Sequence, residues 1–112
     1  MENQEYIIIL YDYYGELLSD IQRKYFEAYY FDNLSLSEIS ENENKSRNAV
    51  HKSIKSVVKK IYEYEDKLKL YEKDEKLKKI ILDIKDNDIK KRLEGLLWME
   101  DYQLNLKIWN YQ

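Results

Sequence analysis

The sequence has 112 residues, the size of one compact domain, with 44% hydrophobic and 37% charged residues. It contains no cysteine, which excludes disulfides and thiolate metal sites, and no proline and only two glycines, which favours helices joined by short turns. Its apolar runs are far shorter than the roughly 20 residues that cross a bilayer, and its acidic start differs from a basic signal peptide. We therefore expect a cytoplasmic protein without a membrane segment.

The net charge of -3 conceals a strong asymmetry along the chain. Residues 1–44 carry ten acidic and two basic residues, whereas residues 45–60 carry six basic residues and no acidic one. Residues 61–112 are nearly balanced, with twelve acidic and eleven basic residues. A basic stripe in an otherwise acidic protein indicates either a surface that attracts phosphate or a solvated helix face, and composition does not separate the two.

The first 30 residues predict two helices. Apolar residues recur at helical spacing from Glu5 to Leu18, and Ser19 with Gln22 forms a capping-box pattern that begins a second helix ending near Tyr30. The residues expected on the inward face of the second helix are Ile21, Tyr25, Phe26 and Tyr29.

A helix-turn-helix pattern follows. Ser35 and Glu38 repeat the capping box and predict a short third helix, and the polar residues 42–45 predict a turn. Ser46 is then expected to cap a fourth helix. Its expected inward residues are Ala49, Val50, Ile54 and Val57. Two short helices around a short turn, the second one basic, are typical of this motif.

The C-terminal half predicts further helices. Apolar residues from Ile54 to Tyr71 alternate steps of three and four, a heptad-like seam that makes the fourth helix long. Another helix is expected over residues 76–84. One of Asp86, Asn87 and Asp88 is expected to cap a last, aromatic-rich helix that runs toward the C-terminus and either packs on the core or meets a second copy. We expect a helix-turn-helix domain over residues 1–72 and C-terminal helices over residues 73–112.

Several segments resemble the YlxM family, in the same order and at similar spacing. They are YGELLS (14–19), QRKY (22–25), YY (29–30), LSLSEI (34–39), SRNAV (46–50) and YEDKLKL (64–70), and together they cover about residues 7–72. The resemblance implies an all-α fold with a helix-turn-helix similar to region 4 of sigma factors, a long fourth helix and a C-terminal helical extension. It also implies a regulatory protein associated with the signal recognition particle pathway.

The sequence departs from the family motif at the turn. Where the motif has apolar residues that wedge the two helices together, this chain has Glu43 and Lys45, and the small residue of the motif is Ser40. A charge buried there without a partner would cost several kcal/mol, so we expect a turn that is looser or splayed outward.

Two hypotheses remain open. The first is a DNA-binding regulator, a homodimer built through the 54–71 seam or through the C-terminal aromatic helix. The second is a module that retains the fold but binds another protein or a structured RNA, which the charged turn and the acidic residues 1–44 favour.

The candidate DNA-binding residues lie at the start of the fourth helix, since the first turns of a recognition helix enter the major groove. The residues expected near base edges are Ser46, Arg47, Asn48, His51 and Lys52, and those expected on phosphates are Lys55, Lys59 and Lys60. The alternative is that Ser46 is only a helix cap and that the lysines form a solvated face.

Enzymatic chemistry is not indicated. The chain has a single histidine, His51, and its closely spaced carboxylates, such as Asp86 and Asp88, are better explained as helix caps and surface charges. The twelve tyrosines mostly alternate with aliphatic residues in acidic segments, so they are expected in the core or at an interface and not stacked on bases. We expect no cofactor, no metal and no catalytic residue.

Overall fold

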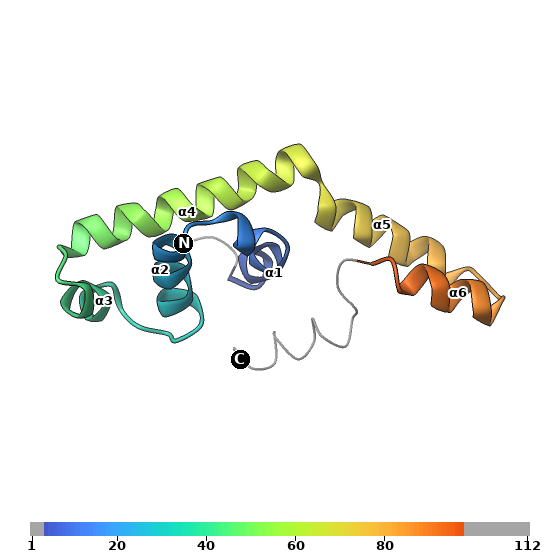
Figure 1. Cartoon of the computed structure of the whole chain (residues 1–112), viewed down its shortest axis with the longest axis horizontal. Helices are drawn as coiled ribbons and strands as arrows, with labels where there is room; N and C mark the ends of the chain where they lie inside the picture. The colour runs from blue at the N-terminus through green and yellow to red at the C-terminus, as the bar shows by residue number, and fades with distance from the viewer. Residues whose placement is uncertain (1–3, 98–112) are drawn as a thin grey trace. The chain divides into compact units, whose positions relative to one another are not determined.

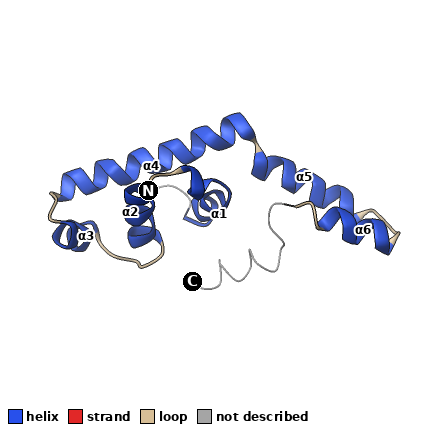
Figure 2. Cartoon of the chain, in the orientation of Figure 1, coloured by secondary structure: helices blue, strands red, loops and turns tan. Residues whose placement is uncertain are grey.

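The computed structural model describes residues 4–97, and all of the regular secondary structure in that range is helical (Figures 1 and 2). The predicted all-α helix-turn-helix fold is therefore confirmed. The chain forms two compact units that divide between Tyr64 and Glu65. The predicted division into a helix-turn-helix domain over residues 1–72 and C-terminal helices over residues 73–112 stays a prediction.

The first helix, α1 (Gln4–Tyr14), ends earlier than predicted and continues as a 3₁₀ turn, η1 (Gly15–Leu17). The backbone N–H of Leu18 donates to the carbonyl of Gly15 at 3.1 Å and closes this turn. A Cβ atom at residue 15 would lie 3.1 Å from Cζ of Tyr11. Glycine here thus lets the Tyr11 ring lie close against the backbone.

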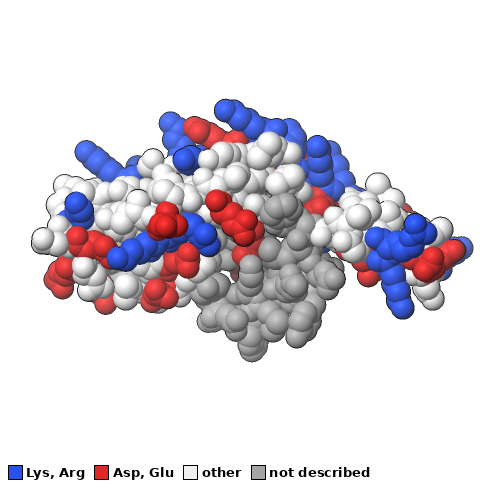
Figure 3. Space-filling view, in the orientation of Figure 1, with Lys and Arg blue, Asp and Glu red and all other residues white. Residues whose placement is uncertain are grey.

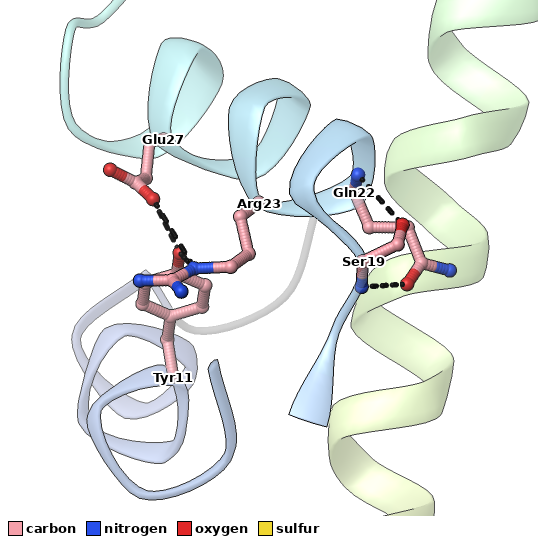
Figure 4. Close-up of polar contacts among 5 residues, drawn as sticks. All are labelled: Tyr11, Ser19, Gln22, Arg23 and Glu27. Atoms are coloured by element: carbon pink, nitrogen blue, oxygen red, sulfur yellow. Dashed lines mark hydrogen bonds and ion pairs between the residues drawn. The ribbon is translucent and has the colours of Figure 1, made fainter. Parts of the chain in front are cut away.

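The second helix, α2 (Asp20–Tyr30), begins at the predicted capping box. The Gln22 N–H donates to Ser19 Oγ at 3.3 Å, and the Ser19 N–H donates to Gln22 Oε1 at 2.9 Å (Figure 4). The predicted inward face is correct for Tyr25 and Phe26, but Ile21 is 52% exposed. Ile21 is the second residue of α2, and the packed face of this helix begins later, at Tyr25.

Aromatic side chains join the helices of the first unit. The ring of Tyr11 in α1 stacks on Phe26 in α2 with centroids 4.2 Å apart. Two further pairs connect α1 to α4 (Arg47–Leu68), Tyr6 with Tyr62 and Tyr14 with Tyr64, each with centroids 5.9 Å apart. As predicted, the buried tyrosines of the described chain belong to the core; they are Tyr11, Tyr13, Tyr14, Tyr25 and Tyr30.

A polar contact lies beside this aromatic stack (Figure 4). The hydroxyl of Tyr11 donates to Glu27 Oε2 at 2.6 Å, and Arg23 Nε donates to the Tyr11 oxygen at 3.4 Å. Burial, and next the hydrogen bond to Glu27, raise the pKa of Tyr11 to about 12. The Tyr11 hydroxyl also raises the pKa of Arg23 through the hydrogen bond between them.

The predicted seam from Ile54 to Tyr71 is interrupted, because α4 ends at Leu68 and α5 (Leu70–Leu82) begins two residues later. Lys69 between them has a left-handed backbone, with φ at 56°. The carboxylate of Glu65 accepts hydrogen bonds from the backbone N–H groups of Tyr71 and Glu72, both at 3.1 Å. A side chain from α4 therefore caps the first turn of α5, where the sequence predicted a continuous helix.

The helix predicted over residues 76–84 starts six residues earlier, at Leu70, and ends at Leu82. It is followed by α6 (Asn87–Glu94). Of the three predicted capping candidates, Asp86 is the cap: its Oδ1 accepts from the N–H groups of Asp88 and Ile89 at 2.9 and 3.1 Å. The aromatic-rich segment predicted to continue to the C-terminus lies largely outside the described residues.

Candidate nucleic-acid interface

The helix-turn-helix consists of α3 (Leu36–Glu43), a turn over residues 44–46, and α4. The predicted capping box starts α3, with the Glu38 N–H donating to Ser35 Oγ at 3.0 Å and the Ser35 N–H donating to Glu38 Oε1 at 3.1 Å. Asn44 ends α3 in the left-handed region at φ 54°, a conformation that asparagine tolerates better than most residues. The predicted cap of α4 is also present, since Ser46 Oγ accepts from the Ala49 N–H at 3.1 Å.

The charged residues at the turn are accommodated in two different ways. Lys45 is exposed, as an outward-pointing turn predicts. Glu43 differs from the expectation, because its side chain is only 19% exposed and its Oε1 lies 2.8 Å from Nζ of Lys24 in α2. The charge of Glu43 is paired with Lys24 of α2, so this side chain does not point outward. Lys24 and Glu43 are 19 positions apart, and no local pattern in the sequence connects them.

Two sets of residues lie on opposite faces of α4. The buried set is Val50, Ile54, Val57 and Ile61, and the exposed set is Asn48, Lys52, Lys55 and Lys59. Both sets have steps of four, three and four, and the second is shifted from the first by two residues. Two residues correspond to about 200° of rotation around a helix, so one set packs on the core while the other forms a ridge that points to solvent.

The other candidates lie around this ridge. Arg47 is exposed in the first turn of α4, and His51 is half-buried beside the packed face. Ser46 is exposed, and its oxygen accepts the capping hydrogen bond. Ala49 was predicted to face inward but is exposed, because the packed face of α4 begins at Val50. The structure thus brings Asn48, Lys52, Lys55 and Lys59 onto one surface and leaves Ser46, Arg47 and His51 at its edges, while Lys60 is half-buried.

The cations of this surface are not neutralised by nearby acids. Within residues 4–97, none of the exposed cations in residues 47–59 of α4 forms an ion pair; these are Arg47, Lys52, Lys55 and Lys59. Cations elsewhere do form ion pairs, for example Arg23 with Glu27 and Lys76 with Glu72. In the same helix, Lys60 Nζ lies 5.9 Å from the centroid of the Tyr64 ring. An unpaired row of lysines leaves its positive charge available to an external anion.

The basic ridge has clear limits. It spans about 16 Å along α4, from Asn48 to Lys59, and the next exposed positions in the same direction are the acidic Glu63 and Asp66. Exposed α3 residues include the acidic Glu38 and Glu41. In Figure 3, Lys and Arg side chains project from the outer edge of α4, whereas Asp and Glu gather over α3. The basic ridge therefore ends before Glu63 in α4 and does not continue onto the exposed face of α3.

The 54–71 seam is not available as a dimer surface over its first half. Ile54, Val57 and Ile61 are at most 1% exposed within a single chain, because they form the packed face of α4. The alternative dimer element, the C-terminal aromatic helix, falls on residues that the structure does not describe. The first half of the predicted seam therefore packs on the core of a single chain, whereas Leu68 in its second half is 46% exposed.

The described residues contain neither a membrane-spanning helix nor a metal-binding cluster. None of the helices in residues 4–97 is both long and apolar enough to span a membrane. In the same part of the chain, no three His, Cys, Asp or Glu side chains come together in a way that would hold a metal ion.

Comparison with known proteins places this geometry in a family. A profile described as "Putative helix-turn-helix protein, YlxM / p13 like" matches residues 1–108. Similar proteins include UPF0122 protein FN1394 of Fusobacterium nucleatum, 41% identical over 88 residues that cover 79% of this chain and 85% of the relative. UPF0122 protein MYPE4850 of Malacoplasma penetrans is 44% identical over 98 residues, which cover 88% of this chain and 89% of the relative. The matched residues contain the whole helix-turn-helix and its basic ridge, and the chain belongs to the UPF0122 family of YlxM/p13-like helix-turn-helix proteins.

Proposed function

We propose that the protein is a regulatory protein that binds double-stranded DNA through the first half of α4. The observation that carries this proposal is the ridge of Asn48, Lys52, Lys55 and Lys59, which points away from the core and has no ion-pair partner among the described residues. Its length of about 16 Å is enough to cross a major groove about 12 Å wide and to reach the phosphates at its edges.

Each candidate residue has a role that follows from its chemistry. In this proposal Asn48 is the base reader, because its amide both donates and accepts and can pair with the edge of adenine. Lys52, Lys55 and Lys59 bind phosphates and supply affinity without sequence choice. Arg47 and His51 contact the groove from the edge of the ridge, and Ser46 mainly holds the first turn of the helix.

The direct test is binding to fragmented genomic duplex DNA at about 50 mM salt, where phosphate contacts are strong. We expect the wild-type protein to bind and the Lys52→Ala/Lys55→Ala variant to lose about tenfold or more in affinity, since each lost phosphate contact weakens binding. Lys76→Ala is the matched control, because Lys76 is exposed on α5 and is paired with Glu72. Equal binding by the double variant and the wild type would argue against the proposal.

The acidic surface of α3 favours a second candidate function. Glu38 and Glu41 are exposed on α3, where they would repel a DNA backbone that follows this helix. This arrangement suits a module that binds another protein through α3, or a structured RNA whose backbone turns away from α3, such as the RNA of the signal recognition particle that the family resemblance implies. A stable complex with that RNA that excess duplex DNA does not displace would favour this candidate over the first.

We also propose that the protein acts in the cytoplasm as a homodimer whose contact lies in residues 73–112. The described part of this region exposes large apolar side chains, with Ile80 at 60%, Leu82 at 74% and Leu96 at 74%. Light scattering after size exclusion should give twice the chain mass of 13.8 kDa. A mass of one chain at micromolar concentration would contradict the dimer without affecting the DNA-binding proposal.

A further inference from the structure

The ion pair between Lys24 and Glu43 joins α2 to the last residue of α3, directly before the turn that leads into α4. Lys24 Nζ and Glu43 Oε1 are 2.8 Å apart, and the Glu43 side chain is largely covered. Where the family motif has an apolar residue, position 43 carries a charge that is paired with α2.

Each end of the turn is closed by its own hydrogen bonds. The Lys45 N–H donates to the carbonyl of Ser40 at 3.0 Å, and the Val50 N–H donates to the carbonyl of Ser46 at 3.1 Å. Ser46 also caps the helix through its side chain. Because only residues 44–46 connect the two capped helices, the contact of Glu43 with α2 constrains where α4 begins.

We propose that Lys24 and Glu43 are positioning residues that hold the basic ridge of α4 in the orientation needed to bind nucleic acid. The inference rests on the function proposed above, and it assigns a role to a residue, Lys24, that lies outside the helix-turn-helix. Neither side chain belongs to the ridge itself. Lys24 and Glu43 therefore affect binding indirectly, because they constrain the turn that leads into α4.

The direction in which Glu43→Gln changes duplex affinity distinguishes a positioning role from simple electrostatics. Glu43→Gln removes a negative charge, so electrostatics alone would strengthen binding to a polyanion. Loss of positioning has the opposite effect, and we expect duplex affinity to fall about two- to fivefold, the range expected for loss of one partly exposed ion pair. The matched control is Glu41→Gln, which removes the same charge from an exposed position of α3 that forms no ion pair within residues 4–97.

The experiment measures duplex affinity at about 50 mM salt for the wild type, Glu43→Gln, Glu41→Gln, and the charge-swapped Lys24→Glu/Glu43→Lys. We expect weaker binding by Glu43→Gln, equal or tighter binding by Glu41→Gln, and affinity within about twofold of the wild type for the charge swap, which retains the pair and the net charge. Tighter binding by both Gln variants would overturn the inference.

A second readout does not need DNA. Amide hydrogen exchange at residues 44–49 should become about two- to fivefold faster in Glu43→Gln and stay unchanged in Glu41→Gln, because only the former loosens the turn. If no variant and no wild-type protein bound DNA, the proposed function would fail, and the exchange result would still decide whether the pair fixes the turn. Unchanged exchange in Glu43→Gln would overturn the positioning role.

Discussion

The hydroxyl of Tyr11 donates a hydrogen bond to Glu27 Oε2 at 2.6 Å and joins α1 to α2 across 16 positions of the chain. The same phenol ring stacks on Phe26 and packs against the backbone of Gly15. A polar and an aromatic contact from one side chain therefore fix the helix pair on which α3 and α4 rest.

Tyr11→Phe should lower the free energy of unfolding by about 1 kcal/mol, because the stacked ring remains while a hydrogen bond to a partly exposed carboxylate is lost. Urea unfolding followed by circular dichroism measures this as a lower midpoint with an unchanged m-value. Tyr29→Phe is the control, since the Tyr29 hydroxyl forms no hydrogen bond with a described residue. Equal losses in the two variants would show that the Tyr11 hydroxyl contributes nothing specific.

The raised pKa of Tyr11, about 12 against an ordinary 10, predicts an alkaline dependence of stability. A raised pKa in the folded state favours the protonated phenol, so its contribution is complete below pH 10 and is lost as the pH rises through about 12. The stability difference between the wild type and Tyr11→Phe should therefore shrink between these pH values. Lysines and the other tyrosines titrate in both proteins, so their effect cancels in this comparison. A stability difference that stays constant with pH would contradict the assignment of the raised pKa to Tyr11.

Glu65→Ala should destabilise the start of α5. The variant removes the acceptor of two backbone N–H groups, at Tyr71 and Glu72, and loss of a helix cap costs about 0.5–2 kcal/mol. Hydrogen exchange of these two amides should speed up more than exchange in α2, which serves as the internal control. Glu65→Gln retains one acceptor oxygen and should show a smaller effect; an equal effect would place the cause in the charge of Glu65 and not in the cap.

The elements that could be predicted from the sequence are those with local causes. The boxes Ser19–Gln22 and Ser35–Glu38 identified two helix starts, because each box is completed within four residues. The basic ridge could also be predicted in part, since the spacing of Lys52, Lys55 and Lys59 is visible in the sequence. The all-α class followed from the absence of proline and the scarcity of glycine.

The features that could not be predicted depend on contacts between distant residues or on an unusual backbone. The break at Lys69 involves no glycine or proline, and a glutamate from the preceding helix stabilises it. Glu43 was expected to open the turn because its partner, Lys24, lies in another helix. The exposure of Ile21 and Ala49 reflects where the packed faces begin, which a periodic pattern determines only to within a turn of helix.

Asn48→Ala tests the assignment of base reading. On a selected duplex site it should lower the preference over nonspecific DNA by about 1–3 kcal/mol while the dependence of affinity on salt stays unchanged, because the amide carries no charge. Competition binding with specific and random duplexes measures the preference. A uniform loss on both duplexes would mean that Asn48 supports affinity and not specificity.

The central claim is that the ridge of α4 binds the phosphates of a DNA duplex, and the most direct test is the slope of log affinity against log salt concentration between about 50 and 200 mM. Each of Lys52→Ala, Lys55→Ala and Lys59→Ala should reduce that slope by about one relative to the wild type, because each removes one phosphate contact. Lys76→Ala should leave the slope unchanged. Slopes that are the same for the wild type and all three ridge variants, or an absence of duplex binding by the wild type at low salt, would contradict the account.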